Sequence, residues 1–381
     1  MPKRGGDPTD MTSLRILHAA DLHLDSPFEG LGAGKAAVRR KEQRELLGAL
    51  AELAEREQAD LVLLAGDLLD SDGSYAETGE ELVRCLRQIQ APVFIAPGNH
   101  DCYTPASPYA RLRMPDNVHI FRKNAIEAVE LPGLQTRVYG AAFTEKTSGP
   151  LLRGFRAPRQ EGWYQILCLH GEVGSGNSRY DPITPEELAG SGLDYAALGH
   201  IHKASGLMRA GRTWYSWPGC PEGRGFDETG EKTVSIVELE GEKCLLRPVC
   251  IAQRRYEQLR VDVTGIDPLL AIHTQLPDDT VSDSYRIVLT GETEAAPDLR
   301  RLQANLDELF FSLQLKDETR LRRSVWDGVG ENSLRGLFLA RLKSRFDAAA
   351  TEQERRGIEQ AARWGLAALD NAEEVAVHED P

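Results

Sequence analysis

Short apolar segments alternate with longer charged segments over the first hundred residues of the chain. The apolar runs at 14–20, 59–66 and 92–97 have the length and composition of buried strands. Between them, helix-like patterns lie within 35–58 and 77–90. Such alternation is typical of βαβ units, in which a largely parallel sheet is covered by helices. The pattern therefore predicts an α/β fold.

Strand-like segments continue at 136–143, 163–171 and 194–202, and further strand and turn patterns follow them. We therefore expect one large α/β domain over residues 13–255. The segment before it, residues 1–12, is rich in Gly, Pro and Asp and is expected to form a disordered tail.

The pattern changes after residue 255. Strand-like and helix-like segments over 256–320 predict a compact β-α-β-α-β domain. Residues 321–381 are expected to form a helical, acidic C-terminal region. Its first part carries apolar residues at helical spacing: Leu334, Leu337, Phe338, Leu342 and Phe346.

Composition places the chain among globular proteins, at 41% hydrophobic and 27% charged residues. The sequence contains neither an apolar run of about 18 residues nor an N-terminal apolar segment of the signal-peptide type. The six cysteines are scattered and form no C-x-x-C pair, which favours reduced thiols. We therefore expect a cytoplasmic protein without a membrane partner.

The net charge of −14 argues against a nucleic-acid partner, because phosphate binding usually leaves a basic surface. The charge is unevenly distributed, however. Residues 347–381 hold nine acidic and three basic residues, or −6, which leaves −8 over the other 346 residues. Bound divalent cations would also add positive charge where a phosphate must lie. The charge therefore weakens a nucleic-acid hypothesis without excluding it.

Polar side chains follow the predicted strands at the points where the strands end. Because open α/β sheets place ligands at the carboxyl ends of their strands, one site would account for all of them. A Gly precedes three of these residues, where it would let the backbone turn sharply. The residues are Asp21 and His23 in "HAADLHLD", Asp67 in "LLAGDLLD", Asn99 and His100 in "IAPGNHD", His170, and His200 and His202 in "LGHIH".

This inventory matches the requirements of a two-metal site. Two neighbouring divalent cations need a bridging carboxylate, oxygen and imidazole ligands, and positions open to water and substrate. Each motif alone also has an ordinary explanation as a turn, a cap or a core histidine. Their occurrence together favours the metal site. Carboxylate, amide and imidazole donors without a thiolate favour Mn²⁺, while zinc, cobalt and iron stay open.

The set "DLHL", "GDLLD", "GNHD", "HGEV" and "GHIH" resembles the calcineurin-like metallophosphoesterase superfamily. Within it, "HAADLHLDSPF" and "YSWPGCPEGRGFDE" resemble the DNA-repair exonuclease branch of the SbcD and YhaO type. The resemblance implies a β-sheet sandwich flanked by helices over 13–255, and a DNA-contacting capping domain over 256–320.

The resemblance also implies roles for individual residues. Asp67 would bridge two divalent metal ions. His100 would be an acid at the leaving oxygen, with Asp101 placed to orient it. The first ion would be held by Asp21, His23, Asp67 and His202, and the second by Asp67, Asn99, His170 and His200.

The roles of two further residues, Asp70 and Arg224, stay open between two alternatives each. Asp70 would either steer the substrate backbone or only order its own loop. Arg224, in "PEGRGFDE", would either contact a phosphate or ribose or form a salt bridge within its loop.

The function implied by the resemblance is a two-metal DNA phosphodiesterase of DNA repair, a 3′–5′ exonuclease with some endonuclease activity. One alternative is a phosphatase or phosphodiesterase for a small molecule or phosphoprotein. Protein phosphatases resemble "GDxxDRG", however, whereas Asp70 is followed here by Ser71 and Asp72. The other alternative, a non-catalytic scaffold, would be expected to lack a ligand residue.

The resemblance further implies an SMC-like ATPase partner of the SbcC type and a homodimer. The amphipathic segment 334–346 would dock the ATPase, or it would pack on its own domain. Helices around 77–90 and 105–113 would pair the two copies. Their apolar candidates, which monomer packing would also explain, are Leu82, Cys85, Leu86 and Ile89.

Overall fold

The computed structural model describes residues 13–71, 75–174, 176–322 and 324–369. The predicted disordered tail, residues 1–12, lies outside this part of the chain. Among the described residues, no helix is both long enough and apolar enough to cross a membrane.

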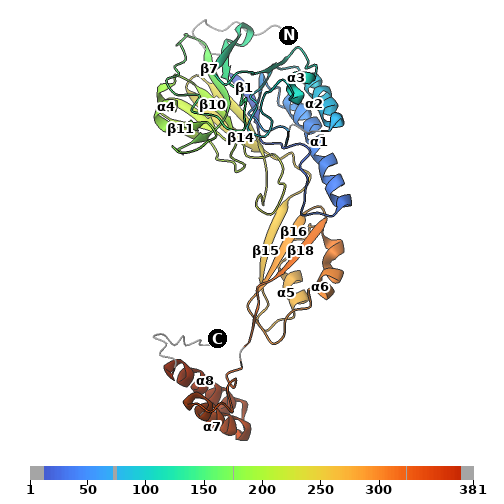
Figure 1. The fold of residues 1–381 in the computed structure, drawn as a ribbon, viewed down its shortest axis with the longest axis vertical. Coiled ribbons are helices and arrows are strands. Elements are labelled where there is room, and N and C mark those ends of the chain that lie inside the picture. The colour runs from blue at the N-terminus through green and yellow to red at the C-terminus, as the bar shows by residue number, and fades with distance from the viewer. Residues whose placement is uncertain (1–12, 72–74, 175, 323, 370–381) are drawn as a thin grey trace. The chain divides into compact units, whose positions relative to one another are not determined.

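Two six-stranded sheets form the centre of the larger part of the chain (Figure 1). In the first sheet, β1 to β4 are parallel, and β13 and β14 are added antiparallel at the β1 edge. The order is β14 (Lys243–Val249), β13 (Val234–Glu240), β1 (Leu14–Ala19), β2 (Leu61–Leu64), β3 (Val93–Ile95) and β4 (Val118–Ile120).

The second sheet has a parallel centre, β6-β7-β10-β12, with antiparallel strands at both edges. Its order is β11 (Met208–Ala210), β12 (Thr213–Ser216), β10 (Tyr195–Gly199), β7 (Tyr164–His170), β6 (Thr136–Gly140) and β5 (Glu127–Leu131). The pair β8 (Glu172–Val173) and β9 (Pro182–Ile183) lies between β7 and β10 in the chain. The predicted α/β class is confirmed, with antiparallel strands at three of the four sheet edges.

The apolar runs of β1 and β2 are continuous because both faces of the first sheet are buried. Leu14 and Ile16 belong to the core cluster shared with the second sheet, whereas Leu17 belongs to the cluster beneath the helices. Helix α1 (Ala33–Arg56) contributes Leu50 to the latter, beside residues of α2 (Ala76–Gln88). On the far face, α4 (Pro185–Gly190) packs against the second sheet through its own cluster.

The four apolar residues considered for a dimer interface are part of this helix-side core. Leu82, Cys85, Leu86 and Ile89 are each at most 3% exposed. The monomer-packing alternative is therefore confirmed for them, and they are not available to a second copy. The helix expected around 105–113 is one turn, α3 (Pro108–Arg111), because the chain becomes extended at Leu112, ahead of Pro115.

The chain divides into two compact units. The first, which contains both large sheets, spans 1–259, 276–287 and 303–315, and the second spans 260–275, 288–302 and 316–381. The boundary runs through the segment predicted as a capping domain. The domain boundaries at 255 and 320 therefore stay predictions. The segment between them contains a three-stranded sheet. The sheet has the order β15 (Tyr256–Asp262), β16 (Ser284–Thr290) and β18 (Ser312–Asp317).

Shorter elements accompany this sheet. They are helices α5 (Pro268–Gln275) and α6 (Leu299–Leu306), and the strand pair β17 (Glu292–Thr293) and β19 (Arg320–Leu321).

The described part of the C-terminal region, up to residue 369, contains two helices, α7 (Leu334–Ala348) and α8 (Glu352–Leu369). Leu339 of α7 and Ala362 of α8 are fully buried in a small core. Phe338 and Leu342 pack against that core, but Leu334 and Leu337 are 72% and 68% exposed. The predicted apolar face of α7 is thus only partly covered within its own unit.

Candidate metal centre

The structure brings all seven predicted ligand residues together. They come from the carboxyl ends of β1, β2 and β3 in the first sheet and of β7 and β10 in the second. Three groups of side chains have candidate ligand atoms within 4.8 Å of one another: Asp21 with His23 and His202, Asp21 with Asp67 and His170, and His23 with Asp67 and His100. Asn99 and His200 complete the set, both against His170.

The backbone at the strand ends turns through unusual conformations. Asp21, His23, Asp67 and His200 all have positive φ values, of 55°, 44°, 51° and 95°. The left-handed region costs a non-glycine residue about 1–2 kcal/mol, and such strain gathers at functional sites. Hydrogen bonds between loops hold it here, since the Asp21 N–H donates to the Gly66 carbonyl and the His23 N–H to the Asp67 carbonyl.

The glycines before the ligands act mainly by allowing close approach. Gly66 has a φ of +89° and makes the sharp turn that we predicted. Gly98 and Gly199, by contrast, do not have positive φ values. A Cβ at Gly199 would lie 1.8 Å from the Ala65 carbonyl oxygen, and one at Gly98 would lie 2.3 Å from an Asp67 carboxylate oxygen. These two positions exclude a side chain because other parts of the site occupy the space.

Two histidines face each other through their Nε2 atoms. The Nδ1 atoms of His23 and His202 lie 3.1 Å from Asp70 Oδ1 and 2.6 Å from Glu228 Oε1. Burial raises the pKa of these two carboxyl groups, but their hydrogen bonds to the histidines and the nearby Arg224 guanidinium together lower it overall. Ionised carboxylates only accept, so each Nδ1 carries the proton. When both rings are neutral, two Nε2 lone pairs face each other at 3.1 Å.

A second cluster of acceptors surrounds His170. Its Nδ1–H donates to the Ala65 carbonyl at 3.0 Å, which leaves Nε2 as an acceptor in the neutral ring. That Nε2 lies 3.0 Å from Asn99 Oδ1 and 3.4 Å from Asp67 Oδ2. In the neutral ring, electron-rich atoms would converge here too without a donor between them.

The electrostatics of the metal-free chain reflect this convergence. Burial, together with the negative charge of Asp67, raises the pKa of Asp21 to about 7. Burial would lower the pKa of His170, but the carboxylates of Asp67 and Asp21 raise it to about 10. Burial lowers the pKa of His23 and of His200 to about 4 each. Without metal, a proton on His170 therefore supplies positive charge that the clustered acceptors require.

Divalent cations fit both clusters. Each cluster offers imidazole lone pairs with carboxylate oxygens, and Asp67 contributes to both. Cations bound there would replace lone-pair repulsion with coordination and would balance two buried carboxylates. The residues present thus match divalent metal ions by donor type and placement, and the assignment of each residue to one ion stays a prediction.

His100 and Asp101 are not joined in the way that we expected. The His100 ring is exposed at the edge of the site, its Nδ1 lies 3.1 Å from the Asp70 carbonyl, and its backbone N–H donates to Asp67 Oδ1. The Asp101 carboxylate instead accepts hydrogen bonds from the backbone N–H groups of 67–69 and from the Tyr109 hydroxyl. These contacts do not support an orienting role for Asp101. The carboxylate fixes the backbone that carries Asp67.

The two ambiguous positions, Asp70 and Arg224, meet beside His23. Arg224 Nη1 donates to Asp70 Oδ1 at 3.2 Å, and Arg224 also pairs with Glu228 at 2.9 Å. Asp70 in turn holds the His23 ring. The loop-ordering and salt-bridge alternatives are therefore both present in the structure, and a direct substrate contact by either residue stays a prediction.

Sequence reasoning missed Glu228. This residue is 6% exposed, and its carboxylate accepts from His202 Nδ1–H and from the Arg224 side chain. A carboxylate behind a metal-ligating histidine fixes the tautomer and makes the other ring nitrogen a better ligand. Glu228 stands at the end of the "GRGFDE" segment, but nothing in the sequence connects it with a histidine 26 residues earlier.

We expect Glu228→Gln to weaken metal binding about 10- to 100-fold, the usual effect of losing such a partner. The amide would no longer fix the Nδ1–H tautomer of His202, so Nε2 would be a poorer ligand. Titration of activity with added metal should show a higher half-saturating concentration and recovery at excess metal. The matched control is Glu231→Gln, an exposed position close in the chain. An unchanged metal titration for Glu228→Gln would contradict the assigned role.

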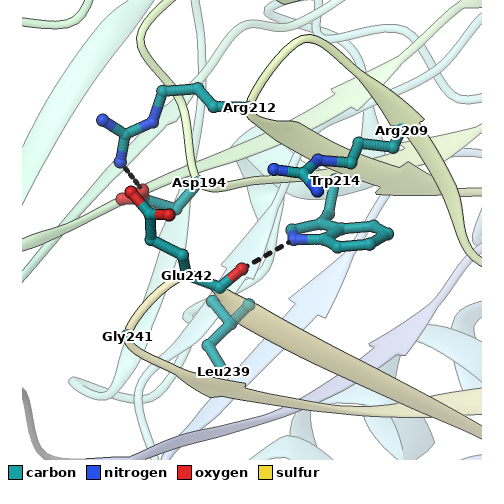
Figure 2. Close-up of a pocket in the computed structure, with 7 residues that line it drawn as sticks. All are labelled: Asp194, Arg209, Arg212, Trp214, Leu239, Gly241 and Glu242. Atoms are coloured by element: carbon teal, nitrogen blue, oxygen red, sulfur yellow. Dashed lines mark hydrogen bonds and ion pairs between the residues drawn. The ribbon is translucent and has the colours of Figure 1, made fainter.

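Among the described residues, no group of candidate metal ligands lies at the amino ends of β10 and β12, where Figure 2 shows a small pocket. A pocket of about 10 Å³ lies there, which is room for a single water at most. Asp194 is paired with Arg212, and Arg209 lies 4.6 Å from the Trp214 ring centre. Candidate metal ligands are thus gathered at the carboxyl edge.

Comparison with known proteins supports this assignment. The family model for calcineurin-like phosphoesterases matches residues 14–204, which contain all seven predicted ligands. It also agrees with the two-sheet α/β core, so the predicted fold class and superfamily are confirmed.

Three relatives show how far the similarity extends. The uncharacterized metallophosphoesterase YhaO of Bacillus subtilis is 30% identical over 83% of this chain and 81% of its own. The SbcD component of the nuclease SbcCD from the same organism is 26% identical over 63% of this chain and 70% of its own. The DNA double-strand break repair protein Mre11 of Aeropyrum pernix is 26% identical over 65% of this chain and 64% of its own. By its motifs, its metal-ligand geometry and these matches, the chain belongs to the calcineurin-like phosphoesterase family and is a metal-dependent hydrolase.

Proposed function

We propose that this enzyme is a two-metal DNA phosphodiesterase of DNA repair, a 3′–5′ exonuclease with some endonuclease activity. The observation that carries the proposal is the pair of acceptor clusters sharing Asp67, with candidate ligand atoms within 4.8 Å. The nuclease SbcCD and the double-strand break repair protein Mre11 among the relatives favour phosphodiester bonds in DNA as the substrate. Mn²⁺ is the metal that the oxygen and imidazole donors favour.

The bound cations and individual side chains would have different roles in the reaction. Two divalent cations, when bound, would offset the charge of the phosphate and supply the nucleophile from water. His100 would act as the acid. In its protonated form, Nδ1–H donates to the Asp70 carbonyl, and Nε2–H is free to pass a proton to the leaving oxygen. Asp101 keeps the Asp67 loop rigid during this transfer.

The two alternative functions have weaker support. A protein phosphatase would be expected to place an arginine after Asp70, where this chain has Ser71. A non-catalytic scaffold has no reason to keep all seven ligand side chains, and they are present and gathered.

Partnership with an SMC-like ATPase of the SbcC type, a homodimer and a cytoplasmic location belong to the same proposal. The exposed Leu334 and Leu337 on α7 support docking by residues 334–346. The four apolar residues considered for a homodimer are buried, so any pairing of two copies would use other surfaces.

The test compares substrates and metals. End-labelled duplex and single-stranded DNA, a nitrophenyl phosphodiester and a nitrophenyl phosphomonoester are incubated with the full chain. We expect DNA and diester hydrolysis with Mn²⁺, loss of both with EDTA, and recovery with added Mn²⁺ that exceeds recovery with Zn²⁺. Shortening from the 3′ end would establish polarity. Hydrolysis of the monoester alone, or activity that survives EDTA, would overturn the proposal.

A further inference from the structure

A surface pocket of about 450 Å³ lies on the first unit, between α1 and the start of α2. Its lining combines two arginines and an exposed tyrosine with only one acidic side chain, in a chain whose net charge is −14. The lining residues are Ala37, Arg40, Arg44, Tyr75, Ala76 and Glu77.

The loop that carries a predicted metal ligand contacts two residues that line this pocket, Tyr75 and Arg44. Asp25, two residues after His23, accepts hydrogen bonds from Thr78 Oγ1 at 2.7 Å and from the Tyr75 N–H at 2.9 Å. Arg44 Nη1 lies 3.4 Å from the same carboxylate. The next residue, Ser26, donates its hydroxyl to both the His23 carbonyl and Asp70. One short loop therefore links residues that line the pocket with the metal centre.

The two arginines are suited to phosphate groups. Arg40 and Arg44 are four residues apart and so lie on one face of α1. Each guanidinium has five N–H donors. Among the described contacts, Arg40 uses one on the Pro27 carbonyl at 3.2 Å, and Arg44 uses one on Asp25. Donors therefore remain on both guanidinium groups for an anionic ligand.

Tyr75 supplies the third element. Its side chain is 57% exposed at the start of α2, where the residue serves as the N-cap through its backbone. An exposed aromatic ring offers a face on which a flat group can stack. Sequence-independent single-strand binding combines such rings with basic side chains that follow the backbone.

We propose that Arg40, Arg44 and Tyr75 hold the single-stranded segment of DNA that continues from the scissile phosphate. The arginines contact backbone phosphates, and a base stacks on Tyr75. This inference rests on the proposed nuclease function and extends it to a substrate contact away from the metal centre. A polymer is the expected occupant, because a small phosphate ester at the metal centre would not extend along the Asp25 loop to α1.

The experiment compares Arg40→Ala, Tyr75→Ala and Tyr75→Phe in the full chain. Cleavage of single-stranded DNA and of a nitrophenyl phosphodiester is measured, together with binding of a fluorescein-labelled single strand by anisotropy in metal-free buffer. For Tyr75→Ala we expect binding about tenfold weaker, and Tyr75→Phe should retain it because the stacking ring remains. The ratio of DNA to diester kcat/KM should fall by a similar factor. Arg87→Ala, an exposed arginine near the other end of α2, is the control.

Salt dependence identifies the phosphate contact. For Arg40→Ala, the slope of log binding constant against log salt should fall by about 0.7, the value for one phosphate contact on a single strand. Wild-type DNA cleavage with unchanged binding and salt slope in the variants would overturn this inference and leave the proposed function standing. An equal loss of diester hydrolysis would also overturn it, because the residues would then support the metal centre. Absence of DNA cleavage by the wild type would refute the proposed function, while the anisotropy data would still decide whether these residues bind the strand.

Discussion

Replacing Asp67 with asparagine should lower phosphodiester hydrolysis by about 10³-fold, because the shared carboxylate is worth several kcal/mol of charge stabilisation. Asp67 lies in both acceptor clusters, with Oδ2 at 3.4 Å from His170 Nε2 and 3.7 Å from His23 Nε2. Without its charge, two neighbouring cations would repel each other with little to offset them.

The substitution is designed to spare the fold. The amide oxygen of asparagine can still accept from the His100 N–H, which donates to Asp67 Oδ1 at 2.8 Å. Asparagine also tolerates the left-handed backbone, here with a φ of 51°. The measurements are diester hydrolysis and metal content per chain, with thermal unfolding as the check on folding.

Asp60→Asn is the matched control. Asp60 lies at the amino end of β2, where its carboxylate accepts from the Arg15 N–H. The Asp60→Asn substitution makes the same chemical change at the opposite end of β2. If Asp67→Asn kept full activity and two metal ions per chain, the shared carboxylate would not be the centre of this site.

The gathering of the candidate ligands could be predicted because it depends on local features of the sequence. A buried strand reads as an apolar run, and a polar residue directly after it must lie at the carboxyl edge of the sheet. Asp21 and Asp67 directly follow the apolar runs at 14–20 and 59–66, and His170 lies at the end of β7, so their convergence could be inferred from their order in the chain.

The contacts behind the ligands were not predictable, because they depend on side-chain direction and on distant loops. The family resemblance implied that Asp101, which is adjacent to His100 in sequence, would orient it. The turn directs its carboxylate to the backbone N–H groups after β2 instead. Glu228 reaches His202 from a separate loop. No periodicity or spacing in the sequence reports such a pairing.

Removal of the His100 ring should separate the role of an acid from that of a metal ligand. We expect His100→Ala to lower DNA cleavage about 10²- to 10³-fold, within the range for loss of a general acid. A nitrophenyl diester should lose less than about tenfold, because nitrophenolate leaves without needing a proton, whereas a DNA alkoxide does need one. Metal content should stay unchanged. His273→Ala, an exposed histidine on α5, is the control.

The competing possibility is that His100 itself binds metal, since its ring lies within 4.8 Å of ligand atoms on His23 and Asp67. Loss of that ligand would lower metal occupancy and slow both substrates by the same factor. The exposure of His100 favours the acid, because Nε2 must reach a leaving group that departs into solvent, whereas His23 and His170 are buried. The ratio of the two substrate rates therefore separates proton transfer from metal binding, whatever the absolute loss of activity.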